Sequence, residues 1–298
     1  MCRPGTEGNL RRIQNEGGDR VEVLRGDLAD AAFTRRVFER NRETTAVFHL
    51  AGQVAVTTSM ADPRRDFEAN LLATFNVLEA MRTLEITAPL LFASTNKVYG
   101  SQSGTAVREL DTRYEYAELP NGTPESHPLD FHSPYGCSKG ASDQYVLDYT
   151  RCFGLKGVVF RQSCVYGYHQ FGIEDQGWVA WFAISAMLGR PITIFGNGKQ
   201  VRDVLFIDDL VDAYWRAIER IDVTAGKAYN IGGGRFQMSL LEFVRILERK
   251  LGRRPEIRFA DSRPGDQKVF VCDTRLAHGD FGWEPHTDIE TGLDRLLG

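Results

Sequence analysis

Tyr135 and Lys139 are the residues of this sequence whose types and spacing most directly allow chemistry. They lie four positions apart in SPYGCSKG, so both side chains share one face of the helix that the following apolar spacing predicts. An ammonium beside a phenol favours the phenolate, and we therefore expect the pKa of Tyr135 to fall from about 10 toward neutral pH. Such a tyrosine can act as general base at a sugar hydroxyl, and the lysine can bind a ribose. The alternative is a surface helix with a lysine that has no partner.

Small and polar residues close three predicted strands. Ligands of open α/β sheets bind beyond the carboxyl ends of the strands, so these positions are candidates for a site. The hydroxyl of Thr95 lies there and can share a substrate proton with Tyr135. The glycine of the second strand end lets a flat ligand approach the backbone, although tight packing against a helix explains it equally well. The three strand ends are Asp27-Leu28, Leu50-Ala51-Gly52 and Ser94-Thr95-Asn96.

The elements that position these residues alternate in type along the chain. The strands are continuous apolar runs, as expected when helices cover both faces of a sheet. This order predicts a doubly wound parallel α/β sheet over residues 1–166, with a smaller mixed α/β lobe over 167–298 interleaved with it. The predicted strands cover 20–28, 46–52, 89–95, 156–167, 192–198 and 200–210. The predicted helices cover 30–40, 62–85, 133–154, 175–191 and 239–252.

Composition excludes several classes of protein. The chain has 298 residues, 42% of them hydrophobic, and a net charge of −4, which argues against general binding of nucleic acid or anionic membranes. No apolar run approaches the roughly 20 residues of a membrane span. The five cysteines are odd in number and contain no C-x-x-C pair, so we expect neither a metal site nor a disulfide framework, and a reducing cytoplasm fits.

Several ordered motifs resemble the extended short-chain dehydrogenase/reductases that act on nucleotide-sugars. The stretches that carry the resemblance are HLAGQVAVTTSMADPRRDFEANLLATFNVLEA, STNKVYG, SPYGCSK, GKQVRDVLFIDDLVDAY and SRPGDQKVFVCDTRLA. The resemblance implies a Rossmann-like fold, a catalytic triad of Thr95, Tyr135 and Lys139, NAD as cofactor and a CDP- or UDP-linked sugar as substrate. It also implies a homodimer formed through the helices of residues 63–85 and 133–154.

Further site residues follow from the same motifs. Arginine forks suit a diphosphate, although a surface salt bridge explains Arg202 or Arg263 as well. The aromatic residues Trp178, Trp181 and Phe195 either stack on the nucleotide base or belong to the core. By resemblance, NAD contacts fall on Asp27, Leu28, Leu50, Ala51, Gly52, Asn70, Ser94, Tyr135, Lys139 and Gln162. Substrate contacts fall on Gln53, Thr95, Asn96, Cys164, Arg202 and Arg263.

The residues after Thr95 discriminate among the reactions of this family. Dehydration of the sugar needs an acid and a base, and family dehydratases resemble Thr-Asp-Glu or Thr-Ser-Glu there. Here Asn96 and Lys97 follow, which supply no carboxylate, and Lys97 is either functional or a solvated loop charge. The branch of the family that this sequence resembles most is the CDP-paratose 2-epimerase (tyvelose epimerase) branch, which implies epimerisation at C2 of a CDP-dideoxyhexose. The stretches that carry this resemblance are STNKVYG and RQSCVYG with QFGIEDQGWVAWF. The alternatives are a UDP-hexose 4-epimerase, a nucleotide-sugar reductase or decarboxylase, and a non-catalytic relative.

The family's phosphate loop, Gly-x-x-Gly-x-x-Gly, is not found in this sequence. Gly5-Thr6-Glu7-Gly8 follows no predicted strand, and Gly232-Gly233-Gly234 lies too late in the chain. By analogy we expect a leading β-α-β unit of roughly 30–40 residues to be missing before Met1, and the opening MCRPGTEGNL to be a loop that follows it. We therefore expect the chain as given to bind NAD weakly and to have low stability.

Overall fold

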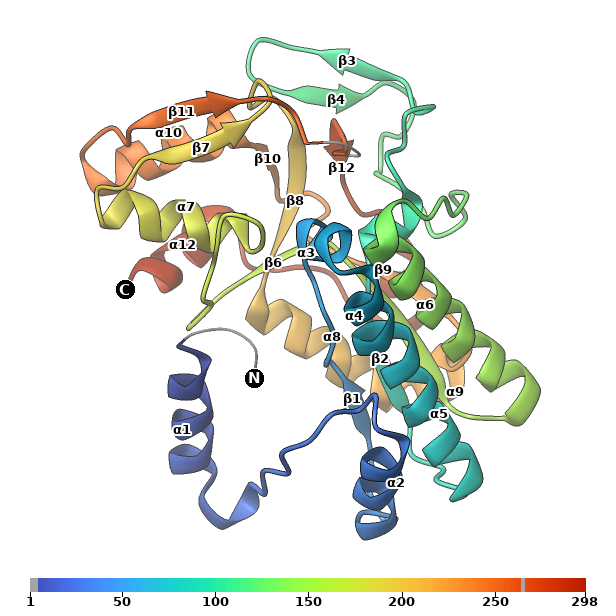
Figure 1. Cartoon of the computed structure of the whole chain (residues 1–298). Coiled ribbons are helices and arrows are strands. Elements are labelled where there is room, and N and C mark those ends of the chain that lie inside the picture. Colours follow the sequence, from blue (N-terminus) through green and yellow to red (C-terminus); the bar gives the residue numbers. More distant parts are fainter. Residues whose placement is uncertain (1–4, 264–265) are drawn as a thin grey trace.

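The central feature is a sheet of four parallel strands in the order β1-β2-β5-β9 (Figure 1). The computed structural model describes residues 5–263 and 266–298. In the sheet, Val47 pairs with Leu90 and Leu90 with Gly157, so the carboxyl ends of the strands meet at one edge. This confirms the predicted parallel α/β sheet. The four strands are β1 (Val47–His49), β2 (Leu90–Thr95), β5 (Gly157–Gln162) and β9 (Ala228–Ile231).

Helices cover both faces of this sheet, which makes the fold doubly wound. Successive residues of β2 point to opposite faces, so Leu90 and Phe92 pack in one core and Leu91 in another. The first core lies against α2 (Ala31–Arg40), α5 (Ala73–Thr83) and α6 (Ser133–Phe153). The second lies against α8 (Ile207–Glu219) and α11 (Arg275–Phe281), with α9 (Ile221–Thr224) beside them.

The N-terminal region differs from the sequence prediction in two places. A helix, α1 (Thr6–Gly17), stands where a loop is predicted, and a short 3-10 helix, η1 (Gly18–Arg20), follows it. Residues 21–27, predicted as a strand, form no regular structure and leave the sheet edge at β1 unpaired. A strand requires a neighbour for its backbone hydrogen bonds, and this segment has none in the described chain. Figure 1 shows α1 standing apart from the sheet, in agreement with its lack of buried residues.

The predicted helix over 62–85 is divided into three parts. It consists of α4 (Pro63–Phe67), a π-helical turn η2 (Glu68–Leu72) and α5, with the short α3 (Val56–Ala61) before it. π-helical turns widen a helix locally and are frequent at functional sites. Here the turn contains Asn70, which is buried against α6.

A second group of elements lies over the carboxyl edge of the sheet. Its centre is β8 (Val201–Phe206), which pairs with β6 (Cys164–Tyr166), β10 (Gln237–Ser239) and β12 (Val269–Phe270). The predicted strand 156–167 is thus two strands in two sheets, and the segment predicted over 200–210 is β8 followed by the start of α8.

Two further strand pairs and three helices complete this group. Ser239 and Glu242 form a capping box that begins α10 where the sequence predicts a helix. The helices are α7 (Trp178–Met187), α10 (Leu240–Leu251) and α12 (Ile289–Leu297), and the strands are β7 (Ile192–Phe195), β11 (Ile257–Ala260), β3 (Val107–Glu109) and β4 (Tyr114–Tyr116). Since β9 returns to the first sheet, the division at residue 166 stays a prediction. No helix in the described part of the chain has the length and apolar character needed to span a bilayer.

Candidate active site

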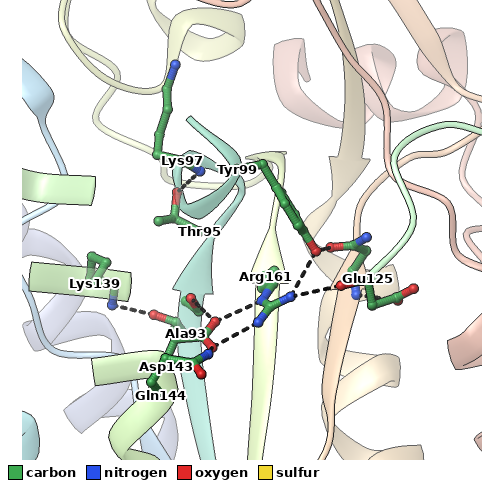
Figure 2. Close-up of polar contacts among 11 residues, drawn as sticks. Ala93, Thr95, Lys97, Tyr99, Glu125, Lys139, Asp143, Gln144 and Arg161 are labelled. Carbon is green, nitrogen blue, oxygen red and sulfur yellow. Dashed lines mark hydrogen bonds and ion pairs between the residues drawn. The ribbon is translucent and has the colours of Figure 1, made fainter. Parts of the chain in front are cut away.

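The carboxyl end of β2 and the first turns of α6 bring Thr95, Tyr135 and Lys139 together. Thr95 is the last residue of β2, and Tyr135 lies near the start of α6, where Pro134 stands within the first turn. The Thr95 hydroxyl favours the ionised form of the Tyr135 phenol. Lys139, one helical turn later, donates from Nζ to the carbonyl oxygen of Ala93 in the same strand (Figure 2). The four-residue spacing therefore does place both α6 side chains toward the strand end.

Burial dominates the proton affinities in this cluster. It lowers the pKa of Lys139 to about 7, against the opposing charges of Asp143 and Asp66. Burial also raises the pKa of Tyr135 to about 12, and the Thr95 hydroxyl only partly offsets it. The expected fall in the pKa of Tyr135 is thus wrong. The Lys139 ammonium donates its hydrogen bond to the carbonyl oxygen of Ala93.

A hydrogen-bonded polar layer of Gln53, Asp66, Asn70 and Ser138, called the supporting layer below, packs beside this cluster. The Asp66 carboxylate accepts hydrogen bonds from Ser138 Oγ at 2.5 Å and from Gln53 Nε2 at 2.7 Å. Asn70 Nδ2 donates to Ser138 Oγ at 3.0 Å, and Asn70 Oδ1 accepts from the Gln53 backbone N–H at 2.9 Å. The layer ties α4 and the π turn to α6 at the residue that precedes Lys139.

The cluster opens into a cleft of about 1640 Å³. Its walls run from the carboxyl edge of the sheet to β7, β8 and α7, as expected for a ligand site in a sheet of this type. Most predicted site residues line it, namely Leu50, Gly52, Ser94, Thr95, Asn96, Tyr135, Lys139, Gln162, Cys164, Arg202 and Arg263.

Five predicted site residues lie outside the wall of the cleft. Asn70 and Gln53 belong to the supporting layer behind Gly52. Asp27 accepts a hydrogen bond from the backbone of Ala29, and the carbonyl oxygen of Leu28 accepts from Thr34 and Asn76. Ala51 is exposed. The structure thus does not bring Asp27, Leu28 and Ala51 to the cleft.

The wall opposite α6 is cationic. Arg202 Nη2 donates to Asp266 Oδ1 at 2.6 Å, and Lys97 Nζ lies 3.7 Å from the same oxygen. Burial lowers the pKa of Lys97, with Asp266 opposing this effect. Lys97 is therefore a partly buried member of the cleft and not a solvated loop charge. Two basic side chains thus face one carboxylate in this wall.

A third cation of the cleft rests on an aromatic ring. The Arg263 guanidinium lies 3.8 Å from the centre of the Phe195 ring and donates to Asp175 Oδ1 at 2.9 Å. Trp178 and Trp181 pack against the core between α7 and α10, and Trp178 also lines the cleft. His49 is a core residue as expected, because it is buried, contacts Thr74 Oγ1 at 3.0 Å and has its pKa lowered to about 3 by burial.

A model of the NAD dependent epimerase/dehydratase family matches residues 3–232. The chain belongs to this family. A family member in Salmonella typhi, CDP-paratose 2-epimerase, is 41% identical over 99% of this chain and 88% of its own length.

Solved structures of the family have the same fold. UDP-glucose 4-epimerase of Thermotoga maritima, solved with UDP-glucose, is 28% identical, with a TM-score of 0.79 over 97% of this chain and 92% of its own. UDP-glucuronic acid 4-epimerase of Bacillus cereus, solved with UDP-glucuronic acid and NAD, is 27% identical, with a TM-score of 0.81 over 97% and 84%. The Rossmann-like fold predicted from the motifs is thus confirmed.

NAD is the cofactor of this family, and the sheet side of the cleft fits its nicotinamide end. The wall there is backbone at Gly52, where a Cβ would lie 2.7 Å from Asn70 Oδ1 and 3.9 Å from Lys139 Nζ. Lys139 and Tyr135 offer hydrogen-bond donors for a ribose. Gln162 also lines the cleft, and its Nε2 donates to Tyr214 Oη at 2.6 Å. These residues would hold the nicotinamide and its ribose.

Sequence reasoning missed the partners of the site residues. Five residues that were not predicted form hydrogen bonds to a predicted site residue, or to one another beside it. They are Asp66, Ser138, Asp143, Arg161 and Asp266. Asp143 offers a local signal, since it follows Lys139 by one further helical turn. Asp266 lies 64 residues from Arg202, and nothing in the local pattern pairs the two.

Proposed function

We propose that this chain epimerises a nucleoside-diphosphate sugar through transient oxidation of one carbon, with C2 of a CDP-dideoxyhexose as the reacting centre. The proposal is supported by the 41% identity with CDP-paratose 2-epimerase of Salmonella typhi and by the arrangement of side chains in the cleft. Thr95, Tyr135 and Lys139 lie at its sheet side, and Lys97, Arg202 and Arg263 lie at its other side. A sugar bound by its diphosphate to the cations has its hydroxyls toward the triad.

Proton transfer falls to Tyr135 and Thr95. Bound NAD would supply a hydride acceptor for the oxidation and a hydride donor for the reduction. Tyr135 Oη accepts the hydroxyl proton during oxidation and gives it back during reduction, and the Thr95 hydroxyl shares that proton. Because burial opposes ionisation of Tyr135, the charge of Lys139 matters for the phenolate that must be present before oxidation and that forms again during reduction.

The same wall argues against dehydration of the sugar. Asn96 and Lys97 stand directly after Thr95 and supply no carboxylate. Two cleft carboxylates, Asp266 and Asp175, accept hydrogen bonds from Arg202 and Arg263. A carboxylate bound to an arginine is a poor general acid, because the guanidinium stabilises its charged form.

A UDP-hexose 4-epimerase is the second candidate. The T. maritima relative, solved with UDP-glucose, has the same fold over nearly its whole length. Both reactions use the same triad and differ in the carbon presented to it. The substrate identity therefore requires direct measurement.

The experiment compares CDP-paratose with UDP-glucose as substrates, in the presence of NAD, by proton NMR of the sugars. We expect inversion at C2 of the CDP-sugar and little change in UDP-glucose. A Tyr135→Phe variant loses about 100-fold or more in kcat while nucleotide binding stays intact. Inversion at C4 of UDP-glucose alone would support the second candidate, and binding of both ligands without turnover would support a non-catalytic relative.

We also propose a homodimer formed through α5 and α6 in the cytoplasm. The proposal is supported by three exposed aromatic side chains on these helices, Phe75, Tyr145 and Phe153. The rings of Phe75 and Tyr145 meet edge to face, with their centres 6.1 Å apart. Tyr145→Glu should convert the dimer to a monomer in light scattering, whereas Phe259→Glu, on exposed β11, should not. A monomeric wild type would contradict the dimer.

A further inference from the structure

Asp143 lies on α6 one turn after Lys139, and both side chains hold strand β2. Lys139 donates to the carbonyl oxygen of Ala93, and Asp143 Oδ2 accepts from Ser94 Oγ at 2.9 Å. These are the two residues directly before Thr95. The helix that carries Tyr135 is therefore fastened to the strand that carries Thr95 at two successive positions.

Arg161 holds Asp143 from the neighbouring strand. Its Nε and Nη2 donate to the two carboxylate oxygens at 2.9 and 3.0 Å, in a fork geometry (Figure 2). Arg161 is also the direct register partner of Ser94 across β2 and β5. Both members of the ion pair are almost completely buried, with exposed side-chain fractions of 4% and 0%.

Arg161 also donates from Nη1 to residues beyond the triad. Nη1 donates to Tyr99 Oη at 3.1 Å and to the carbonyl oxygen of Glu125 at 3.4 Å, and Tyr99 Oη donates to Asn230 Oδ1 at 2.8 Å. A buried ion pair held by several further hydrogen bonds has a defined geometry, at a cost in desolvation. A buried ion pair adds little to the free energy of unfolding, because desolvation of its charges offsets their attraction. Stability therefore does not explain why this pair lies beside Lys139.

We propose that Asp143 and Arg161 are positioning residues that set the charge of the Lys139 ammonium and fix the end of β2 against α6. The described groups that face Lys139 are few. Asp143 and Tyr135 lie on its own helix, Asp66 comes from α4, and His49 comes from β1.

The charges in this pocket nearly cancel. His49 is neutral near pH 7, because its pKa is lowered to about 3, and Tyr135 is protonated. Asp143 and Asp66 oppose the effect of burial on Lys139, whose pKa is lowered to about 7. Arg161 is paired with the Asp143 carboxylate, and the charge of that carboxylate also acts on Lys139. Removal of the Asp143 carboxylate should therefore lower the pKa of Lys139 further and favour its neutral form. Removal of the Arg161 guanidinium should raise the pKa of Lys139 and favour its charged form.

The test titrates Lys139 directly in the whole chain. The protein has seven lysines, so a chain labelled with 13C at lysine Cε has seven resonances, and Lys139→Met identifies the one of interest. Asp143→Asn should lower the titration midpoint of Lys139 by roughly one pH unit or more, and Arg161→Gln should raise it. Midpoints that stay unchanged, or that move in the same direction in both variants, would overturn the proposal.

Two further variants keep the test decisive. Arg216→Gln removes an exposed ion pair with Asp212 on α8 and should leave the Lys139 midpoint unchanged. If a single variant does not fold, the Asp143→Asn/Arg161→Gln double variant replaces it. Its midpoint should fall below that of the wild type, because the lost carboxylate is the nearer charge, and an unchanged midpoint would refute the electrostatic role.

The attachment of the end of β2 to α6 is tested by a separate measurement. Ser94→Ala removes the hydroxyl bonded to Asp143 and leaves every charge in place. It should speed amide hydrogen exchange at the end of β2 without moving the Lys139 midpoint, and unchanged exchange would refute the anchoring role. The proposal rests on the proposed function only for what Lys139 does in catalysis. The titration reads Lys139 itself, so its failure is distinguishable from an absence of epimerase activity.

Discussion

Replacement of Gly52 by alanine tests how tightly the supporting layer is built. A Cβ at this position would lie 2.7 Å from Asn70 Oδ1, which is closer than van der Waals contact allows. Asn70 has no free direction in which to move, because its oxygen accepts from the Gln53 backbone and its Nδ2 donates to Asp66 and Ser138. It is also only 1% exposed.

The expected cost combines two effects. Overpacking of a tight interior costs about 1–3 kcal/mol, and loss of the Gln53–Asn70 hydrogen bond costs about 1 kcal/mol. Gly52→Ala should therefore lower the free energy of unfolding by about 2–4 kcal/mol. Since the same layer bonds Ser138, next to Lys139, the variant should also weaken NAD binding.

Urea denaturation followed by circular dichroism measures the first effect. Gly104→Ala is the matched control, since no atom lies within 4 Å of the Cβ it adds. We expect the control to stay within about 0.5 kcal/mol of the wild type. Equal stabilities for Gly52→Ala and Gly104→Ala would show that Asn70 is free to move and that the layer is not rigid.

Two further predictions concern single charges. The pKa of Lys139 is lowered from 10.5 to about 7 in the folded chain, so the unfolded chain binds more protons between these values and the free energy of unfolding should rise as pH increases from about 7 to 10.5. In denaturation series at several pH values, Lys139→Met should lose this rise, and an identical pH dependence in the variant would contradict it. Arg202→Gln should weaken CDP binding about 10- to 100-fold in isothermal titration, because a charge-assisted hydrogen bond to phosphate is lost. Unchanged affinity would remove Arg202 from the diphosphate site.

The fold was predictable where its signal is local. Helix α6 follows from the three-to-four spacing after Tyr135, and β2 from a continuous apolar run. Segment 21–27 carries the same kind of strand signal but forms no strand, since strand formation also needs a neighbour that residue patterns do not supply. The π turn at Asn70 likewise depends on packing against α6.

The candidate site was predictable in its residues more than in its electrostatics. Tyr135 and Lys139 were identifiable because helical spacing is local. The expected effect of Lys139 on Tyr135 was wrong, because the sequence cannot show that burial is the largest influence on both groups. The partnership of Asp143 with Arg161 joins a helix to a strand, and such pairs become visible only in the folded chain.

The central claim is that the sugar is inverted by oxidation and return of its own hydrogen, with Tyr135 as the base. The most direct test incubates the protein and NAD with CDP-paratose in deuterated water and follows C2 by NMR. We predict inversion at C2 with the original hydrogen retained there and no net accumulation of NADH. Deuterium at the inverted carbon, or a CDP-sugar that stays unchanged with NAD bound, would contradict it.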